Sequence, residues 1–216
     1  GYLPSIGAYA SGMSFDLKNQ DGNAIEKWTW FRNEIFIQST FRDRFAIGGG
    51  LSYDYYKSIN VVDNVGKSQH FINPYVFIRA DTQDDKYFPV RGFYFNAEGK
   101  MIDIFKPDSQ KPLQIKMRMS FAVPVNSWLT YQVEPFGGIS LGEVNYFYQY
   151  GLGEIFEQNL NNFFRFNGYY LGENRNDNVV GVNNYFQFKW NKNYFIIPQI
   201  SFADVFEDFK KADFLK

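Results

Sequence analysis

The chain has 216 residues, a length that one all-β domain can fill without division. Its formal net charge is −1 and its Lys and Arg residues are spread along the sequence, which excludes the basic footprint of a nucleic-acid-binding protein. Cysteine is absent, so disulfides and thiolate metal sites are excluded, and no stretch approaches the roughly 18 apolar residues of a membrane-spanning helix. Aromatic residues nevertheless make up 21% of the chain, an excess that needs an explanation.

Nine segments alternate apolar and polar residues in the manner of β-strands. They span residues 3–17, 26–40, 44–57, 69–81, 90–104, 112–125, 128–141, 178–190 and 193–206. Most exceed the roughly 5 to 6 residues typical of soluble strands, and a tilted strand needs about 9 to 11 residues to cross the hydrocarbon layer. Strand length therefore favours an all-β, antiparallel membrane barrel over a soluble sandwich. In such a barrel, aromatic girdles at the two interfaces account for the aromatic excess.

The connections between these segments differ in length according to the end at which they fall. Short turns are expected at 41–43, 126–127 and 191–192, an intermediate one at 82–89, and long connections at 18–25, 58–68, 105–111 and 142–177. All of the short turns fall at the same end. Bacterial outer-membrane barrels combine tight periplasmic turns with long outer loops, whereas a sandwich gives no reason for this asymmetry.

The clearest alternation lies in residues 113–123. One face carries Leu113, Ile115, Met117, Met119, Phe121 and Val123, and the other carries Gln114, Lys116, Arg118 and Ser120. In a barrel the apolar face meets lipid and the polar face lines the lumen. We therefore expect lumen-facing positions at Gln114, Lys116, Arg118 and, in the next segment, Glu134. On this assignment Met117→Arg costs far more stability than Arg118→Met.

Aromatic residues near the ends of the segments are interpreted as girdle residues at the headgroup level, with ordinary β-core aromatics as the alternative. They are Trp28, Trp30, Tyr55, Tyr56, Trp128, Tyr131, Trp190 and Tyr194. In residues 44–57 the outward positions Phe45, Ile47, Leu51, Tyr53 and Tyr55 alternate with the small or polar inward positions Ala46, Gly48, Gly50, Ser52 and Asp54.

A G-x-S-x-G pattern at 138–142 matches the nucleophile elbow of serine hydrolases, with Ser140 as the serine. That elbow requires a helix after the serine, yet strand and loop formers follow, and the single His70 precedes Ser140. We therefore expect no catalytic residue and no cofactor in this chain. Three acidic residues, Asp81, Asp84 and Asp85, are interpreted as turn residues rather than as metal ligands, so no metal is expected.

A second motif carries a family resemblance. Tyr87, Phe88, Pro89 and Gly92 resemble the FPxxG strand signature of the BamA-like outer-membrane barrel superfamily. In that family two strands follow the signature, and then a long loop folds back into the lumen with an Arg-Gly-aromatic motif. The order is the same here, and the loop motif is matched by Arg165, Gly168 and Tyr169. Asn167 stands where the insertases of the family have Arg.

Four stretches, at 45–53, 135–142, 161–169 and 192–195, also resemble the C-terminal barrel of patatin-like phospholipases anchored in the outer membrane. In that family the hydrolase occupies a separate upstream domain, to which no residue here corresponds. The resemblance implies that residues 1–216 are a partial barrel domain with about nine of sixteen strands. It also implies as partners outer-membrane lipid, an upstream lipase or periplasmic domain, and a homo-oligomer or barrel-completing chain.

Three functions remain open at the level of sequence. The favoured one is a bacterial outer-membrane barrel that anchors a periplasmic patatin-like lipase or conducts its products. A BamA-like assembly or translocation barrel and a passive pore are the alternatives. Because short turns bracket the strands on either side of residues 142–177, this connection must start and end at the outer face. We predict that it folds into the lumen, with 164–169 against the wall and Arg165 paired with an inward carboxylate such as Glu134.

Overall fold

The computed structural model describes residues 2–19, 21–105, 111–153, 162–170, 173–191 and 194–207. One large antiparallel sheet dominates it, in the order β1-β2-β3-β4-β5-β6-β7-β11, with β12 and β13 both paired to β11. Its strands are β1 (Tyr2–Lys18), β2 (Ala24–Phe41), β3 (Phe45–Asn60), β4 (Gly66–Asp81), β5 (Gly92–Met101), β6 (Leu113–Pro124), β7 (Leu129–Leu141), β11 (Asn178–Asn191), β12 (Tyr194–Ile196) and β13 (Gln199–Phe206). The prediction of an all-β antiparallel fold is confirmed.

Several strand ends differ by a few residues from the predicted ones, and two of the differences have a local cause. The segment expected at 193–206 is divided into β12 and β13, because Pro198 lies between them and has no N–H group for the ladder. The segment expected to begin at 90 begins at Gly92, whose φ of +104° favours glycine. The predicted connections at 105–111 and 191–192 lie partly outside the described residues. No helix in the described part of the chain is long and apolar enough to cross a membrane.

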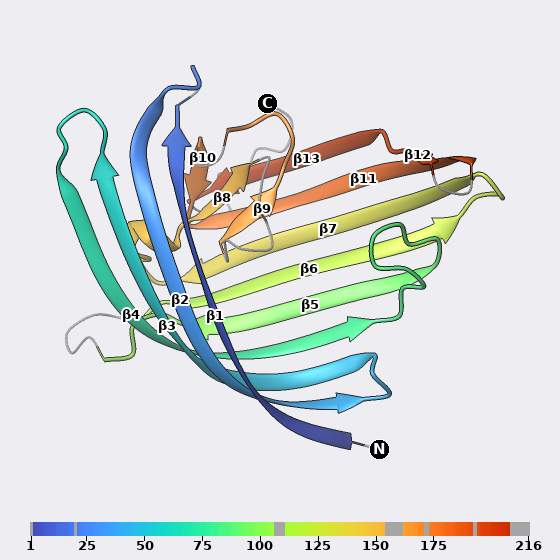
Figure 1. The fold of residues 1–216 in the computed structure, drawn as a ribbon, viewed down its shortest axis with the longest axis horizontal. Helices are drawn as coiled ribbons and strands as arrows, with labels where there is room; N and C mark the ends of the chain where they lie inside the picture. Colours follow the sequence, from blue (N-terminus) through green and yellow to red (C-terminus); the bar gives the residue numbers. More distant parts are fainter. Residues whose placement is uncertain are drawn as a thin grey trace.

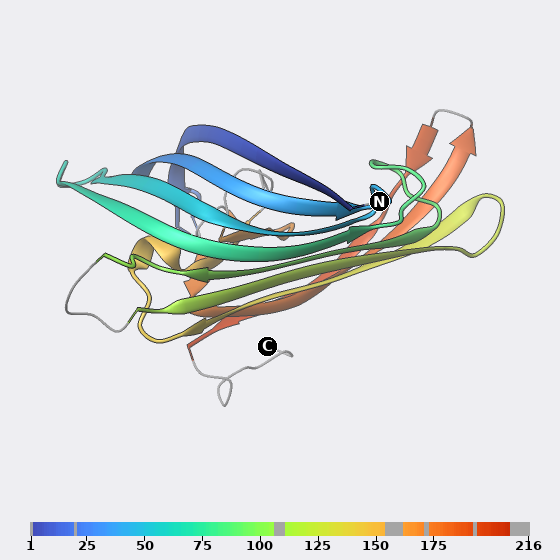
Figure 2. The ribbon, with the colours of Figure 1, turned by 90° about the horizontal axis from the view of Figure 1, so that it is seen from below.

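The sheet is curled into a trough (Figures 1 and 2). The turn between β2 and β3 and the turn between β6 and β7 lie at one end of the trough, called here the short-turn end. The connection between β3 and β4 and the chain that leaves β7 lie at the other end, the long-loop end (Figure 1). Within the described residues the sheet does not close, since β1 pairs only with β2 and β12 and β13 pair only with β11.

Glycines in β3 allow the sheet to bend. A Cβ atom at Gly50 would lie 2.2 Å from the carbonyl oxygen of Ile35, and one at Gly48 would lie 2.7 Å from the ring of Phe77. No larger residue fits at either position without displacing the neighbouring strand or ring. Glycines of this kind mark the tight bends of barrel walls.

The described parts of the connection between β7 and β11, residues 142–153, 162–170 and 173–177, lie inside the trough rather than extending the sheet. They contain a 3₁₀ turn, η1 (Tyr146–Tyr148), and a small sheet of β8 (Tyr150–Gly153), β9 (Phe163–Arg165) and β10 (Asn174–Asn176), in the order β10-β8-β9. The described part of this connection, called here the internal loop, packs on the concave face of the wall in two buried clusters. The predicted folding of this loop into the lumen is confirmed.

The interpretation of Trp28, Trp30 and Tyr56 as girdle aromatics is wrong. All three are buried on the concave face, where they pack with Phe147 and Tyr148 of the internal loop. The Trp28 ring centroid lies 5.0 Å from that of Phe147, and Tyr56 stacks on Phe147 at 5.1 Å. These rings lie near strand ends because the loop fills that end of the lumen. Trp128, Trp190 and Tyr194 are exposed, as girdle residues would be.

Candidate functional site

The two faces of the sheet differ in chemistry. The convex face exposes large apolar side chains, among them Ile35, Ile37, Phe45, Ile47, Leu51, Val76, Ile78, Ile115, Met117, Phe121 and Val123. The concave face buries polar ones, among them Arg32, Ser52, Asp54, Asn73, Gln114, Ser120, Glu134, Asn183 and Gln187. An apolar outside around a polar inside is the pattern of a wall between lipid and a lumen. The candidate site is therefore the lumen and the loop that occupies it.

A buried polar network joins the internal loop to three wall strands. Arg32 of β2 forms an ion pair with Asp54 of β3 at 2.6 Å, and Asn73 of β4 donates to the same carboxylate at 2.8 Å. The hydroxyl of Tyr148, from the loop, also donates to Asp54, at 2.8 Å. Arg32, Asp54, Asn73 and Tyr148 are all buried, and the charges of the pair compensate each other. Asp54 is therefore the point at which loop and wall meet.

A second attachment is a cation among aromatic rings. The guanidinium of Arg175, on β10, lies 4.5 Å from the ring centroid of Trp28 and 4.2 Å from that of Tyr146. It lies 5.7 Å from that of Phe163, and it also donates to the carbonyl oxygen of Tyr146. Contacts between a cation and ring faces are strong where water is excluded. Arg175 thus holds β9, β10, η1 and the wall strand β2 together.

The other end of the loop rests on β7. Phe164 is buried and stacks on Phe136 of β7 with ring centroids 4.8 Å apart. The ammonium group of Lys116 lies 4.9 Å from the Phe164 ring centroid. Asn167 donates to the side chain of Gln199 on β13 at 2.9 Å. The loop therefore contacts the wall from β2 to β13.

The predicted pairing of Arg165 with Glu134 is wrong. Glu134 instead accepts a hydrogen bond from Arg118 at 2.8 Å, and Asn183 donates to its other oxygen at 3.3 Å. Arg118 reaches Glu134 because β6 and β7 are neighbours and both side chains point inward. The side chain of Arg165 is exposed and lines the cavity, while its carbonyl oxygen accepts a hydrogen bond from Asn183 at 3.4 Å.

The remaining residues of the predicted loop motif lie at the turn that follows β9. Gly168 has a φ of +104°, a value that favours glycine, and a Cβ there would meet no atom within 4 Å. Tyr169 stacks on Phe166 with ring centroids 5.3 Å apart. Glycine at 168 therefore serves the backbone turn rather than a close approach to the wall.

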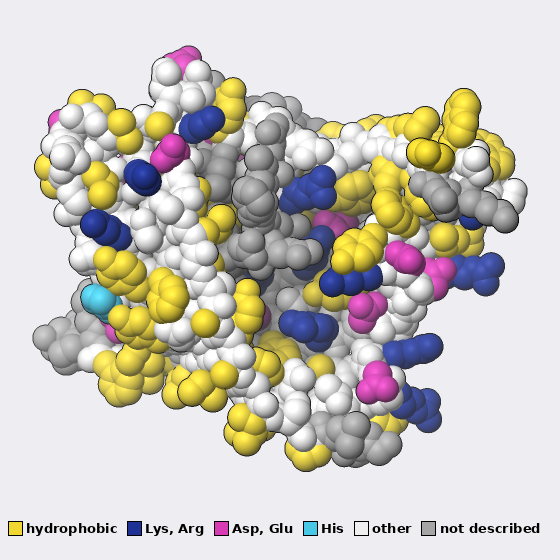
Figure 3. Space-filling model, viewed as in Figure 1, with side chains coloured by type: hydrophobic (Ala, Val, Ile, Leu, Met, Phe, Trp, Pro, Cys, Tyr) yellow, Lys and Arg dark blue, Asp and Glu magenta, His cyan; other side chains and the backbone are white. Residues whose placement is uncertain are grey.

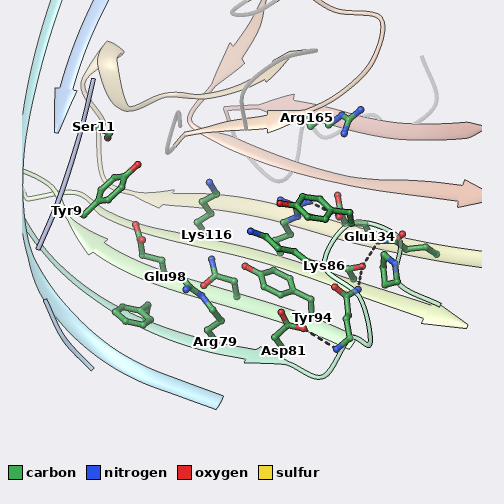
Figure 4. A pocket seen from close by; sticks show the side chains of 18 of the residues that line it. Tyr9, Ser11, Arg79, Asp81, Lys86, Tyr94, Glu98, Lys116, Glu134 and Arg165 are labelled. Atoms are coloured by element: carbon green, nitrogen blue, oxygen red, sulfur yellow. Dashed lines mark hydrogen bonds and ion pairs between the residues drawn. The ribbon is translucent and has the colours of Figure 1, made fainter. Parts of the chain in front are cut away.

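Between the internal loop and the short-turn end lies a cavity of about 1040 Å³. Ten charged side chains among the described residues line it: Arg32, Glu34, Arg79, Asp81, Lys86, Glu98, Lys116, Arg118, Glu134 and Arg165. The space-filling view shows the hollow in the concave face with Lys and Arg side chains around it (Figure 3). Figure 4 shows Arg79, Asp81, Lys86, Glu98, Lys116, Glu134 and Arg165 arranged around the cavity on different parts of the chain. Of the predicted lumen residues, Lys116, Arg118 and Glu134 line it, while Gln114 is buried beneath the loop and donates to the carbonyl oxygen of Tyr148 at 2.8 Å.

Of the residues of the FPxxG resemblance, Tyr87, Phe88 and Pro89 lie in the turn between β4 and β5, at the short-turn end, and Gly92 is the first residue of β5. Asp84 accepts hydrogen bonds from the N–H groups of Val90 and Arg91 at 2.9 and 3.0 Å. Asp85 accepts from those of Tyr87 and Phe88 at 2.7 and 2.8 Å. Pro89 is buried, while Tyr87 and Phe88 are exposed side chains that also line the cavity.

These hydrogen bonds explain the acidic cluster at 81–85 as part of a turn. The N–H groups of Phe88 and Tyr87 lower the pKa of Asp85. Burial opposes the same change at Asp84, but the N–H groups of Arg91 and Val90 leave its pKa lowered. A lowered folded-state pKa contributes stability above the ordinary Asp value of about 3.9, and that contribution disappears as the pH falls through the lowered pKa. In the described part of the chain, no group of three or more acidic or His side chains is placed to hold a metal ion.

The hydrolase-like pattern at 138–142 has a structural explanation. A Cβ atom at Gly138 would lie 2.5 Å from the ring of Tyr150, so this glycine provides the seat for a loop side chain. The Ser140 hydroxyl donates to the carbonyl oxygen of Asp177 at 2.7 Å. Gly142 has a φ of +97° where the chain leaves β7. His70 is on the exposed side of β4, with its ring nitrogen 2.6 Å from the hydroxyl of Tyr53. The pattern thus belongs to the attachment of the internal loop.

Long antiparallel strands, an apolar convex face and a polar lumen with an inserted loop define the wall of a membrane β-barrel. The family model of the OMP85 superfamily matches residues 9–216, so the chain belongs to that superfamily. Members of this family are bacterial outer-membrane proteins.

The crystal structure of BamA from Haemophilus ducreyi lacking POTRA domains 1-3 is similar, with a TM-score of 0.71 and 14% sequence identity. The similarity covers 94% of this chain and 47% of that one, so the chain spans about half the length of the structure it matches. At this identity the similarity shows the fold alone. No curated protein matches the sequence, and neither match concerns a patatin-like phospholipase.

Proposed function

We propose that this chain forms the wall of a bacterial outer-membrane barrel whose lumen is closed by its own internal loop. The observation that carries the proposal is the way the loop is attached. Tyr148, Tyr150, Phe163 and Phe164 are buried between loop and wall, and Tyr148 joins the buried pair of Arg32 and Asp54. A passive pore requires a continuous water-filled lumen, so this arrangement disfavours a pore.

The orientation follows from the lengths of the connections. In outer-membrane barrels the tight turns face the periplasm and the long loops face outward. We therefore assign the short-turn end, with the turn between β4 and β5, to the periplasm. The internal loop then closes the outer half of the lumen, and the cavity lies on the periplasmic side of it.

The proposal predicts that replacing residues 146–176 by a short Gly-Ser linker will open the lumen. In planar lipid bilayers we expect the parent protein to show little conductance and the loop-deleted protein to show a stable open channel. Shortening the exposed hairpin connection at 61–65 is the control, and it should leave conductance unchanged.

Because the deletion removes buried contacts, Tyr148→Ala is a second variant that keeps the rest of the loop. It should increase the frequency of opening without a permanent channel. A parent protein that conducts as much as the deletion variant would contradict the closed-lumen proposal.

For the finer role two candidates stand, each supported by a different observation. Anchoring of a patatin-like lipase domain is supported by the resemblance of residues 45–53 and 135–142 to barrels of that kind. A role in the assembly or translocation of other outer-membrane proteins is supported by the similarity of the fold to BamA.

Depletion of the full-length protein from cells would separate these two candidates. Loss of phospholipid hydrolysis, with normal levels of other outer-membrane barrels, would support the anchor. A general fall in folded outer-membrane barrels would support the assembly role and exclude a pure anchor.

A further inference from the structure

The turn between β4 and β5, residues 82–91, does more than connect neighbouring strands. Its Phe88 stacks on Phe195 of β12, with ring centroids 4.7 Å apart and planes at 9°. Four strands, β5, β6, β7 and β11, separate β4 from β12 in the sheet. Neighbouring strands of a sheet lie about 4.8 Å apart, and β4 and β12 are five such spacings apart along the sheet. The turn therefore spans the mouth of the trough, and we call residues 82–91 the strap.

The strap has a defined internal structure. The carboxylates of Asp84 and Asp85 bind four backbone N–H groups of the strap itself. Its first residue, Thr82, accepts a hydrogen bond from the N–H of Phe93 at 3.0 Å and closes its base. Gly92 belongs to the same base, since a Cβ there would lie 2.4 Å from the carbonyl oxygen of Thr82. A segment bound in this way moves as a unit rather than unravelling.

The contacts of the strap with the wall beyond its base are few. Gln83 donates to Ser120 of β6 at 3.1 Å, and Phe88 meets Phe195. Tyr87, next to Phe88, is 74% exposed. An aromatic pair such as Phe88 and Phe195 changes an equilibrium by about 2-fold to 10-fold. Hydrogen bonds within the strap thus fix its shape, whereas the ring stack that holds it to β12 is weak.

Inward-facing wall residues close to the short-turn mouth are shielded from solvent, and one of them, Ser120, accepts a hydrogen bond from Gln83 of the strap. Ser120, Ala122 and Thr130 point inward close to the short-turn end, and they are 3%, 4% and 5% exposed. The strap residues Lys86, Tyr87, Phe88 and Pro89 line the same cavity as the wall strands, and Figure 4 shows Lys86 among the side chains around it. The strap therefore forms the cover of the cavity on the side opposite the internal loop.

We propose that the strap is a gate at the short-turn mouth of the lumen, latched by the stacking of Phe88 on Phe195. Opening the latch swings the strap away from β12 and gives solutes access to the cavity. This inference rests on the proposed function, because it takes the internal loop to close the other end. The loop and the strap then lie at the two ends of the cavity, with the strap controlling access from the short-turn end.

The chain contains no cysteine, so a thiol reagent reacts only with the cysteines that are introduced. In the protein folded in lipid vesicles, Phe88→Cys with Phe195→Cys should be joined by a short bifunctional thiol reagent and shift in electrophoresis. Tyr87→Cys with Phe195→Cys is the matched control and should react far less. Failure of the first pair to cross-link would show that the strap does not rest on β12.

Gating is tested by labelling Ser120→Cys with a charged water-soluble thiol reagent, because Ser120 is 3% exposed, lines the cavity and contacts Gln83 of the strap. Phe88→Ala and Phe195→Ala should each increase the labelling rate about 2-fold to 10-fold, and the two together should add little more. Tyr194→Ala is the control, because this exposed ring lies next to Phe195 but outside the cavity lining, and it should leave the rate unchanged. Equal rates in the Phe88 and Tyr194 variants would overturn the gate.

The two proposals fail separately in these experiments. The cross-linking and labelling measurements involve only the short-turn end, whereas the loop deletion changes conductance at the long-loop end. If the labelling rate does not change while the loop deletion still opens a channel, the gate is wrong and the closed lumen stands. If the parent already conducts freely but the labelling rates differ as expected, the closed lumen is wrong and the strap still covers Ser120.

Discussion

Replacing Asp54 with alanine is expected to lower the free energy of unfolding by about 3 to 5 kcal/mol, the usual cost of removing one partner of a buried ion pair. Arg32 would remain buried with its charge uncompensated, and Asn73 and Tyr148 would lose the carboxylate that they share. Denaturant titration of the protein folded in lipid vesicles measures this loss. The internal loop would be released together with the pair, so protease should cleave it faster in the variant.

Two further variants make the Asp54 experiment specific. Asp81→Ala, at an exposed carboxylate on β4, should cost less than about 1 kcal/mol. Arg32→Met combined with Asp54→Ala should cost less than Asp54→Ala alone, because the double variant leaves no unpaired charge. A double variant that is the least stable of the three would show that packing, rather than charge, holds this part of the lumen.

Met117→Arg is expected to destabilise the folded barrel by about 2 to 4 kcal/mol, the cost of Arg on the lipid face near the middle of a bilayer. Met117 is an exposed apolar side chain in the convex face of β6, among Ile115, Phe121 and other apolar residues. Folding titrations in lipid vesicles check this value. A matched change is Asn96→Arg, which introduces the same side chain one strand away but into the cavity. Equal costs at the two positions would contradict the assignment of the faces.

The alternation alone predicts that Arg118→Met lowers the stability far less than Met117→Arg, but the structure shows that Arg118→Met is not a suitable control. Arg118 forms an ion pair at 2.8 Å with Glu134, which is buried, so its removal leaves an uncompensated carboxylate. The period of two thus assigns Arg118 correctly to the lumen, but it does not reveal that Arg118 stabilises the wall through its ion pair with Glu134.

In this interpretation the internal loop closes the lumen at the long-loop end, and the strap closes it at the short-turn end. The loop is attached through buried ionic and aromatic contacts around Asp54, Arg175 and Phe164. Among the described residues, one ring stack and one hydrogen bond join the strap to the wall beyond its base. Regions with few buried contacts open at low free-energy cost, so the strap is expected to open far more readily than the loop moves.

The sequence by itself determined the strands, their two faces and the position of the internal loop. Side-chain alternation along a strand is a local property, so the period of two identifies the strands and separates lipid-facing from lumen-facing residues. The lengths of the turns determine at which end each connection lies, and this parity placed residues 142–177 in the lumen. Asp54 could be assigned to the inner face in the same way.

Only the tertiary structure decided which inward residues meet. Trp28 and Trp30 stand near a strand end, a position that suits a girdle as well as a lumen, and only the insertion of the loop shows that they are buried. Glu134 pairs with Arg118 rather than Arg165 because the register of β6 against β7 brings those two together. Tyr148, Arg175 and the contact of Phe88 with Phe195 gave no signal, since they lie in or bind to irregular segments. Such contacts depend on register and on the curvature of the sheet, which join residues far apart in the chain and leave no period in the sequence.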